Sequence, residues 1–283
     1  MSKEKNKQVK RSKNTMRIIS ALLGFPIIAV LLIFGNSTVL DILIAVVSLI
    51  SSYEYCHCFK STKKANPSKW YLFLVSTLLL FVHLSNDVAL KEIIIAFIPF
   101  SFLILIIEMI FSKSKKSIND VAITMLGVCY LPLMLVFLAI IRESLNEGRI
   151  LIWYIFWAAW GSDVFAYVIG RRFGKHKFSE ISPNKSIEGS IAGVIGSILV
   201  ALVYTFAINN ILDLRISYII VSIIMAILSL IGQIGDLAAS SMKRYCGLKD
   251  FGELIPGHGG MLDRIDSVIF ILPFAYILLG LLV

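Results

Sequence analysis

Residues 216–236, ISYIIVSIIMAILSLIGQIGD, are the stretch that decides the fold. Their only charged residue is Asp236 at the end, and their length is what a helix needs to cross the hydrocarbon layer of a membrane. Further apolar stretches of this kind follow one another along the chain and predict an all-α polytopic membrane protein with about nine transmembrane helices. The expected spans are 17–34, 39–58, 70–86, 92–111, 120–141, 150–170, 188–208, 216–236 and 266–283.

Composition supports a membrane protein. Of the 283 residues, 58% are hydrophobic and 16% are charged, which is far more apolar than an ordinary soluble domain. The net charge of +9 could indicate nucleic-acid binding, but the basic residues follow the membrane pattern instead. With a cytoplasmic N-terminus, 23 of the 27 Lys and Arg residues fall in cytoplasmic segments. This bias predicts a cytoplasmic N-terminus and a C-terminus outside.

Two cytoplasmic loop regions, 160–189 and 233–266, combine glycine, charge and hydroxyl groups, and aspartates lie in the spans that lead into them. Asp163 lies within an apolar span, where an ionised carboxylate is costly unless it meets a cation, a proton or water. A helix-packing aspartate bonded to a hydroxyl is the alternative. Asp236 poses the same problem, and Gly232 and Gly235 before it would let another backbone approach. We therefore expect the chemistry in these two regions.

Helical spacing groups the acidic residues. Asp236, Ser240 and Lys243 share one face if their helix continues into the cytoplasm, and Asp263 and Asp266 share a face by the i, i+3 rule. Together these faces would assemble three carboxylates, which are the hard oxygen ligands that Mg²⁺ prefers beside phosphate oxygens and water. The pattern favours a metal site.

A glycine-rich run, PGHGG at 256–260, stands between the two acidic faces. Glycine permits backbone angles and close approaches that other residues do not, so backbone N–H groups can face phosphate oxygens. A tight turn before the last span is the alternative. The basic residues around the run favour a polyphosphate site; they are Lys243, Arg244, Lys249 and Arg264.

The motifs SSMKR (240–244), KD (249–250), PGHGG (256–260) and DRID (263–266) resemble the signature of the phosphatidate cytidylyltransferase, or CDP-diacylglycerol synthase, family. The region of Asp163 and the segment 182–189 also resemble that family, whereas the N-terminal half matches mainly in hydropathy. Asn184 and Ser186 are mild departures from its pattern. The resemblance implies Mg²⁺-dependent transfer of CMP from CTP to phosphatidate, with CDP-diacylglycerol and pyrophosphate as products, and one or two bound cations.

Combining this resemblance with the residue patterns, we expect three sets of site residues. The expected catalytic residues are Asp236, Lys243, Arg244, Lys249, His258, Asp263, Arg264 and Asp266. The expected substrate-binding residues are Asp163, Ser182, Lys185, Ser186, Glu188, Ser240, Gly257, Gly259 and Gly260. The expected metal ligands are Asp236, Asp263 and Asp266. For His258, a phosphate hydrogen bond or a loop-shaping role is favoured over general-base catalysis, because phosphatidate is already ionised near neutral pH.

The organisation that follows is a basic cytoplasmic N-terminal arm at 1–16 and a single transmembrane catalytic domain at 17–283, with its signature region at 233–266. The expected location is a bacterial-type inner membrane with the active site on the cytoplasmic side. CTP, phosphatidate and the lipid bilayer are the expected partners, nucleic acid is not, and a homodimer is compatible with the sequence. An anion transporter and a CTP-dependent lipid kinase are the alternatives.

Glu54 lies near the cytoplasmic end of the second expected span. Its carboxylate could line a cavity for the lipid phosphate, or it could bond Tyr55 or a neighbouring helix. The sequence favours neither over the other.

Overall fold

The computed structural model describes most of the chain. The described residues are 29–84, 87–113, 115–179, 181–183, 185–252, 254 and 259–282, with the side chains of 82–95 left aside. Every regular element among them is a helix, and the only β-type pairing found there is an isolated antiparallel bridge between Lys177 and Ser186. The predicted all-α class is confirmed. The basic arm at 1–16 and the start of the first expected span lie outside the described residues.

Five helical stretches in the described part are long and apolar enough to cross a membrane; they are Ser37–Ser61, Ile118–Ser144, Gly148–Phe173, Ile187–Leu212 and Tyr218–Tyr245. Each covers one expected span. Two other expected spans correspond to shorter apolar helices, Lys69–Phe81 and Ala96–Phe111. Several apolar helices therefore fit a multi-pass membrane protein, while the count of nine spans stays a prediction.

Two of the long stretches contain breaks. Helix α5 (Ile118–Tyr130) is separated from α6 (Pro132–Ser144) at Leu131, because proline lacks the N–H that would continue the helical hydrogen bonding. Helix α7 (Gly148–Phe156) continues through the π-helical segment η2 (Trp157–Gly161) into α8 (Ser162–Phe173). Such π-helical turns are rare and occur frequently at functional sites.

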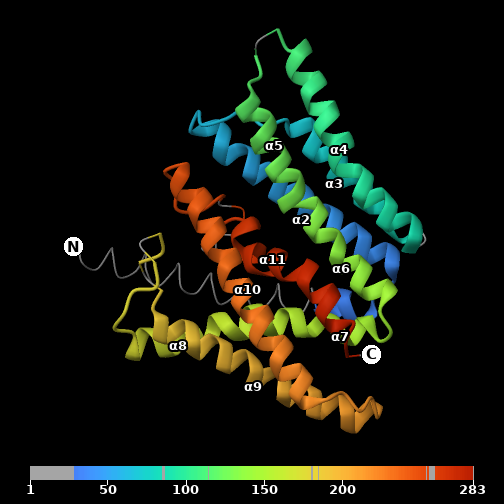
Figure 1. Cartoon of the computed structure of the whole chain (residues 1–283), viewed down its shortest axis with the longest axis vertical. Coiled ribbons are helices and arrows are strands. Elements are labelled where there is room, and N and C mark those ends of the chain that lie inside the picture. Colours follow the sequence, from blue (N-terminus) through green and yellow to red (C-terminus); the bar gives the residue numbers. More distant parts are fainter. Residues whose placement is uncertain are drawn as a thin grey trace, which may run out of the picture. The chain divides into compact units, whose positions relative to one another are not determined.

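The chain forms two compact units, residues 1–128 with 246–264, and residues 129–245 with 265–283. In the first unit, α2 (Ser37–Ser61) packs beside α3 (Lys69–Leu78), as Figure 1 shows. The fully buried Tyr55 donates a hydrogen bond from its hydroxyl to the carbonyl of Ile123 at 2.8 Å. The Tyr55 hydroxyl is thus paired within the unit, as burial away from water favours.

The remaining helices of the first unit are η1 (Leu79–Leu84), α4 (Asp87–Phe111) and the larger part of α5. The carboxylate of Glu108 near the end of α4 accepts a hydrogen bond from the indole N–H of Trp70 at 3.0 Å. It also pairs with Lys116 at 3.9 Å. These contacts tie α4 to α3 and to the loop that precedes α5.

In the second unit, α8 lies along α9 (Ile187–Leu212), and α9 also packs against α10 (Tyr218–Tyr245), as seen in Figure 1. Helix α11 (Leu262–Leu279) packs against α10 where Gly232 and Gly235 leave room for Ile271 and Phe270. A Cβ atom at Gly235 would stand 2.7 Å from the Cβ of Phe270, so only glycine allows this approach. A close approach beside Asp236 is thus present, but side chains of α11 make it and not the backbone that the sequence predicted.

Candidate functional site

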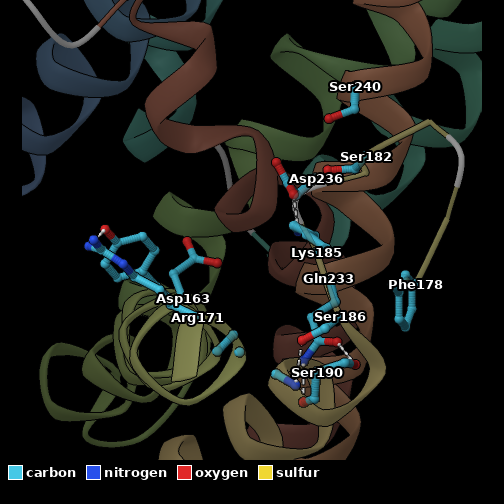
Figure 2. Close-up of a pocket in the computed structure, with 14 residues that line it drawn as sticks. Asp163, Arg171, Phe178, Ser182, Lys185, Ser186, Ser190, Gln233, Asp236 and Ser240 are labelled. Carbon is cyan, nitrogen blue, oxygen red and sulfur yellow. Dashed lines mark hydrogen bonds and ion pairs between the residues drawn. The ribbon is translucent and has the colours of Figure 1, made fainter. Parts of the chain in front are cut away.

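A cavity of about 590 Å³ lies in the second unit between α8, α9, α10 and the loop that joins α8 to α9 (Figure 2). Its lining consists of Asp163, Ala166, Tyr167, Gly170, Arg171, Phe178, Ser182, Lys185, Ser186, Gly189, Ser190, Gln233, Asp236 and Ser240. Both loop regions that the sequence singled out contribute to it. Six predicted site residues meet here; they are Asp163, Ser182, Lys185, Ser186, Asp236 and Ser240.

Asp163 reaches this cavity from the first turn of α8, directly after the π-helical segment Trp157–Gly161. The wider π-turn inserts an extra residue into the helix and so changes the direction in which the following side chains point. Figure 2 shows the Asp163 carboxylate at the cavity, facing the side from which Lys185 and Asp236 enter. Asp163 thus lines the cavity, and its predicted role in substrate binding stays a prediction.

Asp236 forms an ion pair with Lys185, drawn as a dashed line in Figure 2. The two side chains keep 24% and 33% of their surface exposed, so the pair is open to the cavity. Asp236 lies on α10, and Lys185 lies in the loop just before α9. The pair therefore joins the two predicted loop regions through opposite charges.

Asp266 and Lys243 form a second pair at 3.8 Å, and only 8% and 10% of their side-chain surfaces are exposed. Asp236 and Asp163 are the acidic groups whose charges act on Asp266. Three carboxylates and two lysines are thus electrostatically linked in this unit. Helix α10 continues to Tyr245, so Asp236, Ser240 and Lys243 share a face as predicted.

A preformed cage for a metal ion is absent from the described residues, because no three His, Cys, Asp or Glu side chains there come close enough to hold one. Mg²⁺ commonly takes only one or two carboxylates together with waters and substrate phosphates. Asp236 and Asp266 fit that donor set, since both are carboxylates now balanced by a lysine. Asp263, the third predicted ligand, lies in the first unit and stays a prediction.

Asp263 organises the glycine-rich loop in front of α11. One of its carboxylate oxygens accepts hydrogen bonds from the backbone N–H groups of Phe251 at 2.9 Å and Gly260 at 3.1 Å. Gly259 has a φ of +88°, in the left-handed region that favours glycine. Special backbone geometry is therefore confirmed at Gly259, whereas Gly257 and His258 lie outside the described residues.

Other predicted residues have different surroundings. Lys249, Arg244 and Arg264 have exposed side chains, so their predicted contacts with phosphate stay predictions. The carboxylate of Glu188 accepts hydrogen bonds from the backbone N–H groups of Lys175 and His176, and it contacts the His176 ring at 2.6 Å. Glu188 thus shapes the loop that borders the cavity, and it is not among the residues that line it.

Ser186 caps the N-terminus of α9, where its hydroxyl accepts a hydrogen bond from the backbone N–H of Gly189 at 3.1 Å. It also lines the cavity, so the start of α9 faces that space. A helix N-terminus carries partial positive charge and exposed N–H groups, which favour anions. The position agrees with the predicted substrate contact.

Gln233 is the main site residue that the sequence prediction did not include. Its amide nitrogen donates hydrogen bonds to the Ser162 hydroxyl and to the Ser190 carbonyl, both at 3.1 Å, and the Ser190 hydroxyl donates to its amide oxygen. These bonds join α8, α9 and α10 beside the cavity. The available signal was an amide one helical turn before Asp236 inside an apolar span.

A second cavity of about 610 Å³ lies in the first unit, between α2 and the loop after α10. Its polar lining comes from Tyr53, Glu54, His57, Ser61, Lys249 and Asp250. Lys249 thus lines a different cavity from the one that contains Asp236, and its predicted contact with phosphate stays a prediction.

Comparisons with known proteins identify chains of similar sequence. Phosphatidate cytidylyltransferase from Staphylococcus saprophyticus is 40% identical over 196 residues, which are 69% of this chain and 70% of that protein. The protein of the same name from Staphylococcus haemolyticus is 39% identical over 196 residues, with the same shares of the two chains. That from Staphylococcus aureus is 40% identical over 194 residues, 68% of this chain and 70% of that protein.

A family model described as the cytidylyltransferase family matches residues 15–282. The match includes both loop regions, the cavity and the glycine-rich loop. The chain belongs to the cytidylyltransferase family.

Proposed function

We propose that this protein transfers CMP from CTP to phosphatidate, giving CDP-diacylglycerol and pyrophosphate for phospholipid synthesis. The observation that carries the proposal is the cavity beside α10, where Asp163, Asp236 and Lys185 meet in a chain whose relatives are named phosphatidate cytidylyltransferase. A mixed acidic and basic lining of this kind suits two polyanionic substrates, because it can bind both cations and phosphates.

In the proposed reaction, an oxygen of the phosphatidate phosphate forms a bond to the α-phosphorus of CTP. The bond from that phosphorus to the oxygen bridging to the β-phosphate breaks, and pyrophosphate leaves with the electron pair. The nucleophile is already ionised, so the protein mainly has to position two anions and neutralise charge. Lys185 and Arg171 at the cavity can do this for phosphate oxygens, and the N-terminus of α9 adds N–H groups.

The carboxylates of Asp236 and Asp266 would hold Mg²⁺, which would withdraw charge from the phosphate oxygens when bound. Lys185 and Lys243 balance these carboxylates in the structure. Mg²⁺ held by these carboxylates would balance their charge, and both ammonium groups would then be available to phosphate oxygens. The paired lysines thus keep the acidic cluster stable before substrates bind.

The proposal also includes the membrane arrangement that the basic residues predict. Nine spans, a cytoplasmic N-terminus and an outside C-terminus would place the cavity at the cytoplasmic face of a bacterial inner membrane. The 23 Lys and Arg residues in predicted cytoplasmic segments support this orientation. CTP would then enter from the cytoplasm, and phosphatidate would enter from the bilayer.

The direct test incubates the purified full-length protein with phosphatidate, Mg²⁺ and CTP labelled at the α-phosphate. We expect a labelled lipid that is CDP-diacylglycerol, an equal amount of pyrophosphate, and loss of both products when the divalent cation is chelated. Transfer of label only from γ-labelled CTP, with release of CDP, would instead identify a lipid kinase. Movement of an anion across liposomes without either product would favour a transporter.

A further inference from the structure

We propose that Glu54 is a positioning residue, whose buried carboxylate holds the first turn of α11 and the glycine-rich loop before it in the geometry that the reaction needs. The inference rests on the proposed function, and it concerns residues of the first unit only. Glu54 lies on α2, far from the signature region in the chain, and none of the predicted site motifs includes it.

Glu54 on α2 caps the N-terminus of α11, although the two helices are far apart in the sequence. Its two carboxylate oxygens accept hydrogen bonds from the backbone N–H groups of Met261 at 2.9 Å and Leu262 at 2.8 Å. Leu262 is the first residue of α11, and the first N–H groups of a helix have no partner within it. Only 4% of the surface of Glu54 is exposed, so these bonds form largely out of water, where an unpaired N–H would be costly.

Two glycines make room for this carboxylate. A Cβ atom on Gly260 would stand 2.5 Å from one Glu54 oxygen, and one on Gly252 would stand 2.7 Å from the other. Such distances are too short for carbon and oxygen, so any larger residue would displace the carboxylate or the loop. Glu54 is therefore enclosed by both ends of the loop between Gly252 and Gly260.

Asp263 extends the same arrangement. It follows Leu262 on α11, and its carboxylate accepts hydrogen bonds from the N–H groups of Phe251 and Gly260. Glu54 binds the N–H groups of the two residues between Gly260 and Asp263. The direction of Asp263 and the position of Gly260 at the end of the glycine-rich loop therefore both depend on where the Glu54 carboxylate lies.

A carboxylate is suited to this task because it has two oxygens that accept hydrogen bonds at once, whereas an amide of the same shape has one acceptor and a donor. Glu54→Gln should therefore set an N–H group against the N–H of Met261 or Leu262. The loop would shift without a change in side-chain volume, and a shift of this kind at a distance from the reacting atoms can lower turnover by about 100-fold.

The first experiment compares wild-type protein with Glu54→Gln, and uses Glu147→Gln as the matched control because Glu147 is exposed in the loop before α7. Each protein is assayed for CDP-diacylglycerol formation at saturating CTP and phosphatidate, per folded molecule, and for deuterium exchange of the backbone amides at 259–265. We expect Glu54→Gln to lower kcat by about 10- to 100-fold and to speed exchange in that segment alone. The control should keep both values.

The second experiment reaches the same carboxylate from the opposite side. Gly252→Ala should crowd Glu54 and lower kcat, while Gly280→Ala, near the end of α11 with only ordinary contacts of 3.4 Å or more, should not. If Gly252→Ala acts through Glu54, the variant that combines it with Glu54→Ala should be no slower than Glu54→Ala alone, since the crowding has then been removed. Such non-additivity is expected only for residues in contact.

The outcomes are separable. A normal kcat in folded Glu54→Gln would overturn the inference. So would additive effects of Gly252→Ala and Glu54→Ala on kcat. So would faster exchange across all helices with unchanged turnover, which would assign Glu54 to general stability. If the wild-type protein makes no CDP-diacylglycerol, the proposed function fails instead, and the exchange at 259–265 still tests the cap.

Discussion

At the scale of single residues, carboxylates and lysines in apolar surroundings are paired. Asp236 pairs with Lys185, and Asp266 with Lys243. The Asp266–Lys243 pair is buried, so removing one of its partners would leave an uncompensated charge away from water, which is strongly destabilising, whereas the Asp236–Lys185 pair is open to the cavity. Lys243 thus stabilises the folded state without substrates, and both lysines are available for the proposed binding of phosphates.

Replacing Asp236 by asparagine removes one negative charge and keeps the shape. We expect Asp236→Asn to lower the rate of CDP-diacylglycerol formation by at least about 100-fold, because a proposed ligand and the partner of Lys185 are both lost. The assay is the α-labelled CTP incubation. Asp213→Asn is the control, since the Asp213 side chain is 82% exposed; near-normal turnover of folded Asp236→Asn would refute the assignment.

At the scale of elements, helices α8, α9 and α10 are held together by close-packed small residues and by one polar cluster. Gly193 on α9 leaves room for the Ser162 hydroxyl, and that hydroxyl accepts a hydrogen bond from Gln233 on α10. Helices in lipid cannot rely on the hydrophobic effect to associate, so such packing and hydrogen bonds set their arrangement. The cavity exists because these three helices meet in this register.

Gln233 joins all three helices, so we expect its replacement to lower the free energy of unfolding. Gln233→Leu introduces an apolar side chain of similar size and removes the bonds to Ser162 and Ser190. Each such bond within a membrane contributes about 0.6 to 2 kcal/mol. We expect a lower melting temperature for the detergent-solubilised protein. Ser222→Ala on the same helix, which loses only a bond to its own helix, should melt close to wild type. Equal melting of both variants would contradict this view.

At the scale of the whole molecule, the structure has several apolar helices, and the charge pattern predicts which side of the membrane their ends face. Engineered cysteines at Lys115 and Lys249 should react with a membrane-impermeant reagent only from the cytoplasm, and one at Asn146 only from outside. Cys56, Cys58 and Cys246 are buried, so a Cys129→Ser background should be nearly silent. Reaction from the reverse sides would overturn the orientation.

The orientation also predicts which leaflet supplies the lipid. Phosphatidate can keep its acyl chains in hydrocarbon while its phosphate enters at the cytoplasmic face, whereas exposing the chains would cost roughly 0.8 kcal/mol per CH₂. In sealed vesicles with phosphatidate in one leaflet, CDP-diacylglycerol should form rapidly only when that leaflet is on the same side as the cytoplasmic loops of the protein. Equal rates from the other leaflet, without lipid flip-flop, would contradict lateral entry.

Much of this protein was predictable from sequence. Runs of about 20 apolar residues must be helical in lipid because every backbone polar group needs an internal partner, so the all-α class followed from hydropathy. Local spacing also placed Asp236, Ser240 and Lys243 on one face. Gly232 and Gly235 predicted a close approach beside Asp236, although side chains of α11 make it and not a backbone. These inferences depend only on residues near each other in the chain, whose geometry the helix itself determines.

Contacts between distant residues were decided only by the tertiary structure. Lys185 meets Asp236, Gln233 meets Ser162, and Glu54 caps a helix that begins 208 residues later. From the sequence, Glu54 could line a cavity for the lipid phosphate, or it could bond Tyr55 or a neighbouring helix. The hydrogen bond from Leu262 of α11 shows the contact with another helix, and a role in binding the lipid phosphate stays a prediction. The physical reason is that helical periodicity determines only which face of its own helix a residue occupies. Which other helix packs against that face depends on small residues and paired polar groups from distant parts of the chain.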